Sequence, residues 1–168
     1  GRGSEGGRRT GRGGGASKWG GPGEEDRKNV NRFDSRYLVR NNRVLDNYIR
    51  GVGELYRSAN GIFAGFVVDC LIARDEVHET PYSSISLGWG WAWEVYHAGR
   101  GNIIEQNAVF RSFGDGLSDG GSIYTHNRNP DTVIRRNYLH KHRAYHALLY
   151  PDIGSAQILF DQIGRAHA

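Results

Sequence analysis

One short pattern of apolar and polar residues recurs along the chain. An aliphatic residue is followed by two residues, an Asn or Asp, one further residue and a second aliphatic residue, at 44–49, 72–77, 104–109, 134–139 and 158–163. The polar residues of successive copies lie 28, 32, 30 and 24 residues apart. A repeat of this length predicts a solenoid, in which each copy forms one coil and stacks on the next.

The local chemistry of the copies indicates strands. The segments are short, rich in β-branched residues and bounded by Gly, Asn, Asp or Pro, which is typical of strands. A second short strand is expected in each coil, at 61–63, 84–86, 122–124 and 147–150. No long segment carries the apolar spacing of a helix. Because crossovers between parallel strands are right-handed, the sequence predicts an all-β fold, an incomplete right-handed parallel β-helix of about four to five coils.

The recurring Asn or Asp fits a turn. Its side chain can bond nearby backbone, tolerate a left-handed conformation and stack on its equivalents in neighbouring coils. We therefore expect one ladder at one corner of the solenoid, made of Asn47, Asp75, Asn107 and Asn137. The alternative is an ordinary mixed β domain in which the spacing is accidental and these residues are scattered.

Both ends differ from the repeat region. Residues 1–30 hold 11 of the 25 glycines and little that can be buried, so nothing offsets the entropy of ordering them. We expect 1–35 to be a disordered Gly/Arg-rich segment that is not native, and 36–162 to be the β-helix. Residues 163–167 match the translation of a common sequencing adapter, so 163–168 is expected to be a non-native tail. Without any methionine, the chain is expected to be a fragment.

Charge and composition limit the kinds of partner and cofactor that the sequence favours. Residues 1–43 carry a net charge of +6 and residues 44–168 a net charge of −2, which argues against a nucleic-acid face on the folded part. No apolar run is long enough for a membrane span. A single cysteine excludes an internal disulfide, and no spacing is typical of a zinc site. We expect no cofactor and no metal; the sequence does not indicate an oligomeric state.

Three stretches, 81–91, 117–125 and 149–155, resemble the right-handed parallel β-helix glycoside hydrolases of the pectate-lyase-like superfamily. They are most similar to glycoside hydrolase family 141. The resemblance implies hydrolysis of a polysaccharide or oligosaccharide, with fucosidase- or xylanase-like activity, and a secreted or periplasmic location. The sequence departs from the pattern at three places: Ile153 stands where such proteins often have Glu, Ser84 stands in place of a usual Gly, and His146-Ala147 stands in place of a frequent Gly-Gly pair.

Asp119 and Asp152 are the candidate catalytic residues. Glycosidic cleavage requires two carboxyl groups, and these two lie beside strands of successive coils with glycine on their C-terminal side. In extended strands their offset would be about 20 Å, whereas glycosidase carboxyls lie roughly 5–10 Å apart. The pair therefore requires the chain to fold back at Gly120 and Gly121. The alternatives are a pair of Asp152 with His126, stacked one coil apart, or two aspartates that only form turns.

Aromatic residues surround these candidates in the sequence. Trp89 and Trp91 alternate with glycine in the longest spacing between repeats, so both can point to one side of an extended segment. We expect them to form a wall against which sugar rings stack. Tyr82, Tyr124 and His126 are the other predicted substrate-binding residues. The alternative for the tryptophans is a hydrophobic flap that packs a loop onto the coil.

Three functions remain open. The first is a glycoside hydrolase, and the second is a non-catalytic β-helix that binds glycans or supports other domains. A polysaccharide lyase is the third, although β-helix lyases use calcium held by clustered carboxylates and the carboxylates here are dispersed. The first two differ in whether Asp119 and Asp152 converge on one aromatic-walled cleft.

Overall fold

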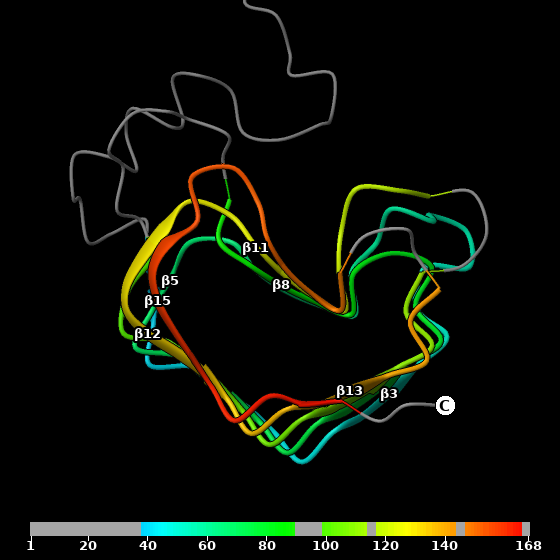
Figure 1. Cartoon of the computed structure of the whole chain (residues 1–168), viewed down its shortest axis with the longest axis horizontal. Coiled ribbons are helices and arrows are strands. Elements are labelled where there is room, and N and C mark those ends of the chain that lie inside the picture. The colour runs from blue at the N-terminus through cyan, green and yellow to red at the C-terminus, as the bar shows by residue number, and fades with distance from the viewer. Residues whose placement is uncertain (1–37, 90–98, 114–116, 144–146, 166–168) are drawn as a thin grey trace, which may run out of the picture.

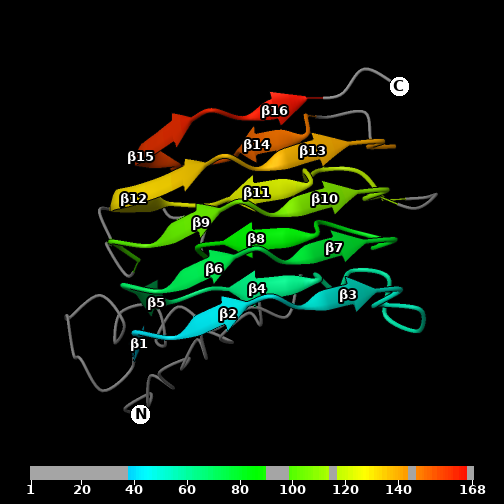
Figure 2. The same cartoon turned by 90° about the horizontal axis from the view of Figure 1, so that it is seen from below.

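The computed structural model describes residues 38–89, 99–113, 117–143 and 147–165. Within them it is all-β without a helix, and its strands stack coil on coil. The chain advances in the right-handed sense from the N-terminal to the C-terminal end (Figures 1 and 2). The predicted right-handed parallel β-helix is therefore confirmed. The expected disorder of residues 1–35 lies outside the described residues.

Three parallel sheets run along the solenoid, and a small fourth sheet covers one corner. The first sheet contains β2 (Arg43–Leu45), β6 (Leu71–Ala73), β9 (Ile103–Glu105), β12 (Arg128–Arg135) and β15 (Ala156–Asp161). The second contains β3 (Tyr48–Arg50), β7 (Glu76–His78), β10 (Ala108–Phe110), β13 (Tyr138–His140) and β16 (Gly164–Arg165). The third contains β4 (Ile62–Ala64), β8 (Ile85–Leu87), β11 (Ile123–Thr125) and β14 (Leu149–Pro151). In the small sheet β1 (Val39–Arg40) pairs with β5 (Val67–Val68).

The last coil extends beyond the expected end of the repeat. The sequence predicts that the solenoid ends at residue 162, but β16 still pairs in parallel with β13. Gly164 donates its backbone N–H to the Asn137 carbonyl at 3.0 Å, and Ile163 packs against the core. Strand pairing uses backbone groups, which any sequence supplies, and Ile163 is the second aliphatic residue of the last copy. The backbone pairing of β16 and the packing of Ile163 therefore continue the coil.

The predicted corner ladder joins the first and second sheets. Asn47 donates its backbone and side-chain N–H groups to Asp75 Oδ1, each at 2.8 Å. The backbone N–H of Asp75 donates to Asn107 Oδ1 at 2.9 Å, and that of Asn107 donates to Asn137 Oδ1 at 3.0 Å. The stacking is confirmed, and each coil is joined to the next by a bond that only a short polar side chain at this position can accept.

The left-handed conformation, however, falls on the residue before each ladder position. Positive φ angles of 54–59° occur at Asp46, Arg74, Gln106 and Arg136. The Asn or Asp, which can tolerate this conformation, therefore does not adopt it. The ladder residue needs its N–H aimed along the solenoid axis toward the next coil, so the preceding residue makes the turn.

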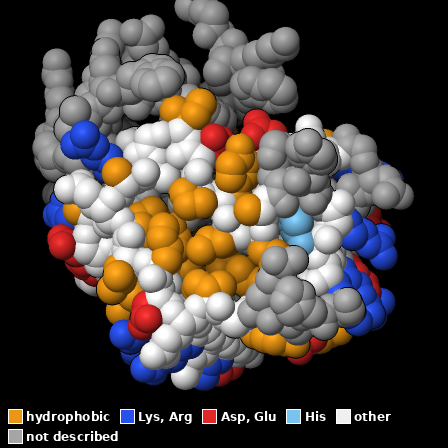
Figure 3. All heavy atoms as spheres, viewed as in Figure 1, with side chains coloured by type: hydrophobic (Ala, Val, Ile, Leu, Met, Phe, Trp, Pro, Cys, Tyr) orange, Lys and Arg blue, Asp and Glu red, His pale blue; other side chains and the backbone are white. Residues whose placement is uncertain are grey.

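The core lies between the three sheets and repeats with the coils. Each of the central strands puts at least one aliphatic side chain fully inside, as in the set Ile85, Ile104, Val109, Ile123, Ile134 and Leu139. At the C-terminal end of the solenoid hydrophobic side chains face the viewer in Figure 3. Leu159 is 60% exposed and Phe160 37% exposed in this last coil, because no further coil of the described residues covers them.

Asp75 is a weak point in the ladder, and Asp75→Asn is expected to stabilise the fold. Asp75 is buried, and its Oδ2 has no hydrogen-bond partner among the described residues. At the equivalent positions Asn107 Nδ2 donates to the Ile72 carbonyl at 3.1 Å and Asn137 Nδ2 to the Ile104 carbonyl at 2.9 Å. An amide at residue 75 would face the equivalent carbonyl and keep the acceptor that Asn47 uses.

We expect the free energy of unfolding to rise by about 1–2 kcal/mol, since a buried oxygen that lacks a donor is replaced by an amide nitrogen that donates to a carbonyl. Urea denaturation measures this change. Asp46→Asn, at the exposed neighbouring corner position, is the matched control because Asp46 is paired with Arg74 at the surface. A decrease in stability of Asp75→Asn relative to the unchanged chain would contradict the prediction.

Candidate active site

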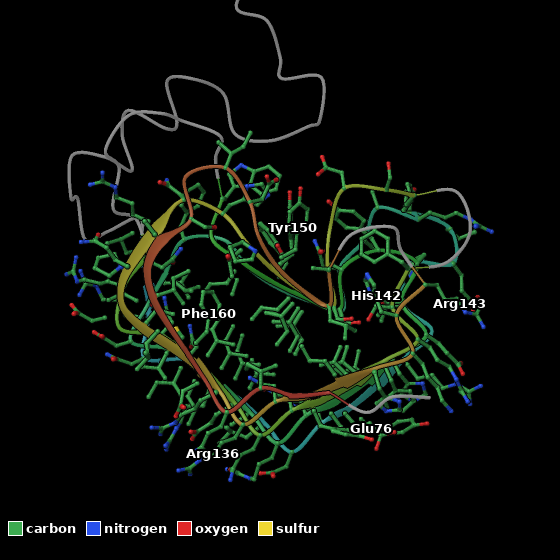
Figure 4. All side chains as sticks on the ribbon, in the orientation of Figure 1. Glu76, Arg136, His142, Arg143, Tyr150 and Phe160 are labelled. Atoms are coloured by element: carbon green, nitrogen blue, oxygen red, sulfur yellow. The ribbon has the colours of Figure 1, made fainter. Side chains whose placement is uncertain are left out.

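The outer face of the third sheet carries a row of aromatic side chains. Since side chains alternate across a strand, the residue after each inward aliphatic points outward. The parallel register stacks these outward residues in the order Phe63, Ser86, Tyr124 and Tyr150. Tyr150 points away from the solenoid interior in Figure 4. This face therefore offers flat apolar rings beside polar groups, with a small serine between them.

Asp152 lies at the end of β14, against Tyr124 of the coil below. The Tyr124 hydroxyl donates a short hydrogen bond to Asp152 Oδ2. The Asp152 backbone N–H donates to the Thr125 carbonyl at 2.9 Å, which stacks Asp152 over His126 as expected. The Tyr124 and His126 rings meet edge to face at 4.4 Å between centroids, and both side chains are buried. Asp152 itself is half-buried, so its carboxylate is held at a partly covered position.

Asp119 reaches the same place from the segment that leads into β11. It adopts a left-handed conformation with φ of 69°, which turns the chain just before Gly120 and Gly121. Its carbonyl accepts a hydrogen bond of 2.7 Å from the Tyr82 hydroxyl, and its charge is among the causes that raise the pKa of Tyr150, after burial and the charge of Asp152. The left-handed turn therefore falls on Asp119 itself, one residue before the glycines at which the sequence analysis placed the fold-back.

Gly120 and Gly121 are fixed by close packing. A Cβ on Gly120 would lie 2.4 Å from Phe113 Cζ. A Cβ on Gly121 would lie 2.8 Å from both the Ala147 carbonyl oxygen and Tyr150 Cβ. These distances leave no room for a side chain, and the glycines therefore allow the Asp119 turn to lie directly against β14.

The charges of Asp119 and Asp152 help to raise the pKa of the same three tyrosines. Burial, followed by the charge of Asp119, raises the pKa of Tyr82 to about 12. Burial and the hydrogen bond to Asp152 raise the pKa of Tyr124. Burial, followed by the charges of both aspartates, raises the pKa of Tyr150. The three hydroxyls therefore stay protonated and serve as hydrogen-bond donors beside the carboxylates.

His126 is kept neutral by its burial. Burial lowers the pKa of His126 below its ordinary value of 6.5, although the charges of Asp152 and Asp119 oppose the shift. The unfolded chain therefore takes up this proton more readily than the folded one. The free energy of unfolding should fall as pH drops below about 6.5, until the folded pKa is passed, by roughly 1.4 kcal/mol for each unit of pKa difference.

His126→Gln should remove the fall in the free energy of unfolding that His126 causes at acid pH. Urea denaturation between about pH 5 and pH 8 measures this change. Burial and the charges of Lys141 and Arg111 also lower the pKa of His140. His140→Gln, at a less buried position, is therefore the matched comparison, with a smaller effect expected. An unchanged pH dependence in His126→Gln would contradict the assignment.

Trp89 lies at one edge of this region, after the left-handed Gly88 with φ of 82°. Its ring centroid is 5.4 Å from that of Phe63 and 6.5 Å from that of His126. Trp89 therefore lies near His126, and its ring packs on Phe63. Trp91 lies outside the described residues.

Two residues of the aromatic row, Phe63 and Tyr150, were missed by the sequence reasoning. Phe63 is 52% exposed, and Tyr150 packs on Tyr124 at 5.4 Å between ring centroids. The available signal was positional: both residues follow the inward aliphatic of a predicted strand in the third sheet.

Two further histidines, His140 and His142, pack against neighbouring side chains of the solenoid. His142 Nδ1 lies 3.0 Å from Ser122 Oγ, and its ring packs on Phe113 at 5.2 Å. His140 stacks on Phe110 at 4.8 Å. The described parts of the chain contain no group of three or more His, Cys, Asp or Glu that could hold a metal ion. Among the same residues, no helix is long and apolar enough to span a membrane.

Comparison with known proteins gives one informative likeness. No family model matches the chain, and no curated protein matches it. A solved structure named glycoside hydrolase superposes with a TM-score of 0.67 at 26% sequence identity, over 79% of this chain and 25% of that one. The chain thus spans about a quarter of the length of this neighbour. Similarity in both fold and sequence to a glycoside hydrolase supports a carbohydrate-active β-helix.

Proposed function

We propose that this chain is part of a glycoside hydrolase that cleaves a polysaccharide with Asp119 and Asp152. The observation that carries the proposal is the hydrogen bond from Tyr124 to Asp152, beside Tyr82, whose hydroxyl donates to the Asp119 carbonyl. Two carboxyl groups that share one set of tyrosines have the composition of a glycosidase site. The aromatic row supplies the surface on which sugar rings stack.

The surroundings of the two aspartates suggest different roles. The Tyr124 hydroxyl holds the Asp152 carboxylate in place at a half-buried position, so Asp152 suits the nucleophile or the general base. Asp119 is exposed and lies at a turn, so a bound sugar would cover it and disfavour its charge. That change suits the general acid, which must hold a proton for the leaving oxygen.

The substrate class follows the resemblance of the sequence motifs. The stretches 81–91, 117–125 and 149–155 are similar to family 141 of the pectate-lyase-like superfamily, and they include the β8, β11 and β14 strands under the proposed site. We therefore propose a fucosidase- or xylanase-like activity on a plant or host polysaccharide. Such a substrate implies a secreted or periplasmic protein.

A non-catalytic glycan-binding module is the second candidate. It is favoured by Ile153, which is 41% exposed next to Asp152 where related sequences often have Glu. Without that second acidic side chain, the aromatic face would bind a glycan and leave it intact.

The test is incubation of the chain with xylan, with a fucosylated polysaccharide and with a pectic polysaccharide. Hydrolysis releases new reducing ends, whereas a lyase releases an unsaturated product that absorbs ultraviolet light. Binding without either product would support the module, and the absence of both binding and cleavage would reject the carbohydrate assignment.

A further inference from the structure

A hollow of about 640 Å³ lies at the corner that follows the second sheet. Its size is within the range of small-molecule sites. Three arginines contribute to its lining, together with two glutamates and an apolar wall: Arg57, Arg111, Arg143, Glu54, Glu79, Pro81 and Phe113. Arg143 lies on the outer side of the coil in Figure 4, on a side of the molecule where Lys and Arg gather in Figure 3.

Successive coils bring these arginines together. The Gly51 backbone N–H donates to the His78 carbonyl, which stacks Gly51 on Glu79, and the Arg143 N–H donates to the Ser112 carbonyl. Gly53, with φ of 80°, approaches Pro81 so closely that a Cβ would lie 2.7 Å from Pro81 Cγ. The hollow therefore runs along the solenoid axis, with neighbouring coils about 4.8 Å apart.

The hollow carries a net positive charge. Glu79 is bound at one oxygen by Arg111 Nη1 at 2.8 Å and at the other by Arg50 Nε at 2.7 Å. Those bonds lower the pKa of Glu79 and keep it ionised. Because two guanidinium groups share this one carboxylate, the positive charge of the corner is only partly neutralised. Arg143 and Arg57 add two positive charges and Glu54 one negative charge, so the side chains that line the hollow carry a net charge of +1.

We propose that this hollow binds an anionic substituent of the glycan, the carboxylate of a uronic acid or a sulfate ester. The proposal rests on the proposed carbohydrate function and names its substrate class. Guanidinium groups match such oxyanions with paired hydrogen bonds. Pro81, over the buried Phe113, provides an apolar surface for the sugar ring that carries the acid.

The hollow lies next to the proposed catalytic residues. Phe113 packs on Tyr82 at 5.2 Å between ring centroids, and the Tyr82 hydroxyl donates to the Asp119 carbonyl. An acidic sugar in the hollow would therefore lie near Asp119, on a branch or at an adjoining unit of the same glycan.

The test measures the Kd of matched ligands by titration calorimetry with the full chain. Trigalacturonate is compared with its methyl ester, which has the same sugars without the charge, and a sulfated galactan trisaccharide with its unsulfated form. The chain should bind the charged member of at least one pair roughly tenfold more tightly, and which pair shows the preference identifies the acid.

Arg143→Gln should abolish this preference, because it removes a guanidinium of the hollow without breaking the Glu79 bonds. The matched control is Arg40→Gln, an equal change of charge at an exposed residue of β1, which should keep the preference. Equal binding of charged and neutral ligands, or equal effects of the two variants, would overturn the proposal.

The outcome is independent of catalysis. Asp119→Asn and Asp152→Asn leave the arginines of the hollow in place, so a hydrolysis test can fail while the preference for acidic sugars persists. Conversely, hydrolysis of neutral glycans without that preference would reject the hollow and keep the proposed function.

Discussion

Asp152→Asn is expected to lower kcat/KM for polysaccharide hydrolysis on the order of 10²–10⁴-fold, with the fold retained. The amide can still accept a hydrogen bond from Tyr124, whose hydroxyl now donates to Asp152 Oδ2. It cannot attack a sugar carbon or take a proton from water. Reducing-end release from the polysaccharide measures the loss, and urea denaturation confirms that the variant is folded.

Asp119→Asn should separate the two roles through the leaving group. A general acid is needed for a sugar leaving group but hardly for nitrophenolate, which departs without a proton. Asp119→Asn should therefore lose activity on the polysaccharide and keep most of it on a nitrophenyl glycoside. Asp152→Asn should lose activity on both substrates.

Asp131→Asn is the matched control for both variants, since Asp131 is an exposed aspartate with a left-handed φ of 59° outside the proposed site. Its activity should equal that of the unchanged chain. If Asp119→Asn retained full activity on the polysaccharide, the two-carboxylate assignment would be wrong, and Asp152 with His126 would be the pair to test.

Asn107→Ala is expected to reduce the free energy of unfolding by about 2–4 kcal/mol. Asn107 is buried in the middle of the corner ladder, where Oδ1 accepts from the Asp75 N–H at 2.9 Å. Its Nδ2 donates to the Ile72 carbonyl at 3.1 Å and to Asn137 Oδ1 at 2.9 Å. Alanine would leave several buried polar groups without partners at once, and such groups are costly.

Chemical denaturation measures this loss, and Gln106→Ala is the matched control. Gln106 is the exposed neighbour of Asn107, and its side chain is outside the ladder. A loss in Asn107→Ala no larger than that in Gln106→Ala would show that stacked side-chain bonds do not hold the coils together.

The repeating interior of this protein could be predicted from its sequence. The aliphatic residues and the Asn or Asp of each copy recur because every coil must fill the same core and close the same corner. That requirement predicted the parallel β-helix, the four strands of the third sheet and the ladder from Asn47 to Asn137. It did not predict which residue takes the left-handed turn, since Arg74 and Gln106 carry no compositional signal for it.

The outer surface was decided by the tertiary structure. No core constrains outward side chains, so Phe63, Ser86, Tyr124 and Tyr150 share a row without sharing a residue type. Coils of unequal length hide that register from any count along the chain. Asp119 and Asp152 were found as acidic residues beside glycines, but their common contact with the tyrosines depends on a turn and on stacking. The arginine hollow has the same origin, because Arg57, Arg111 and Arg143 meet only where successive coils superpose.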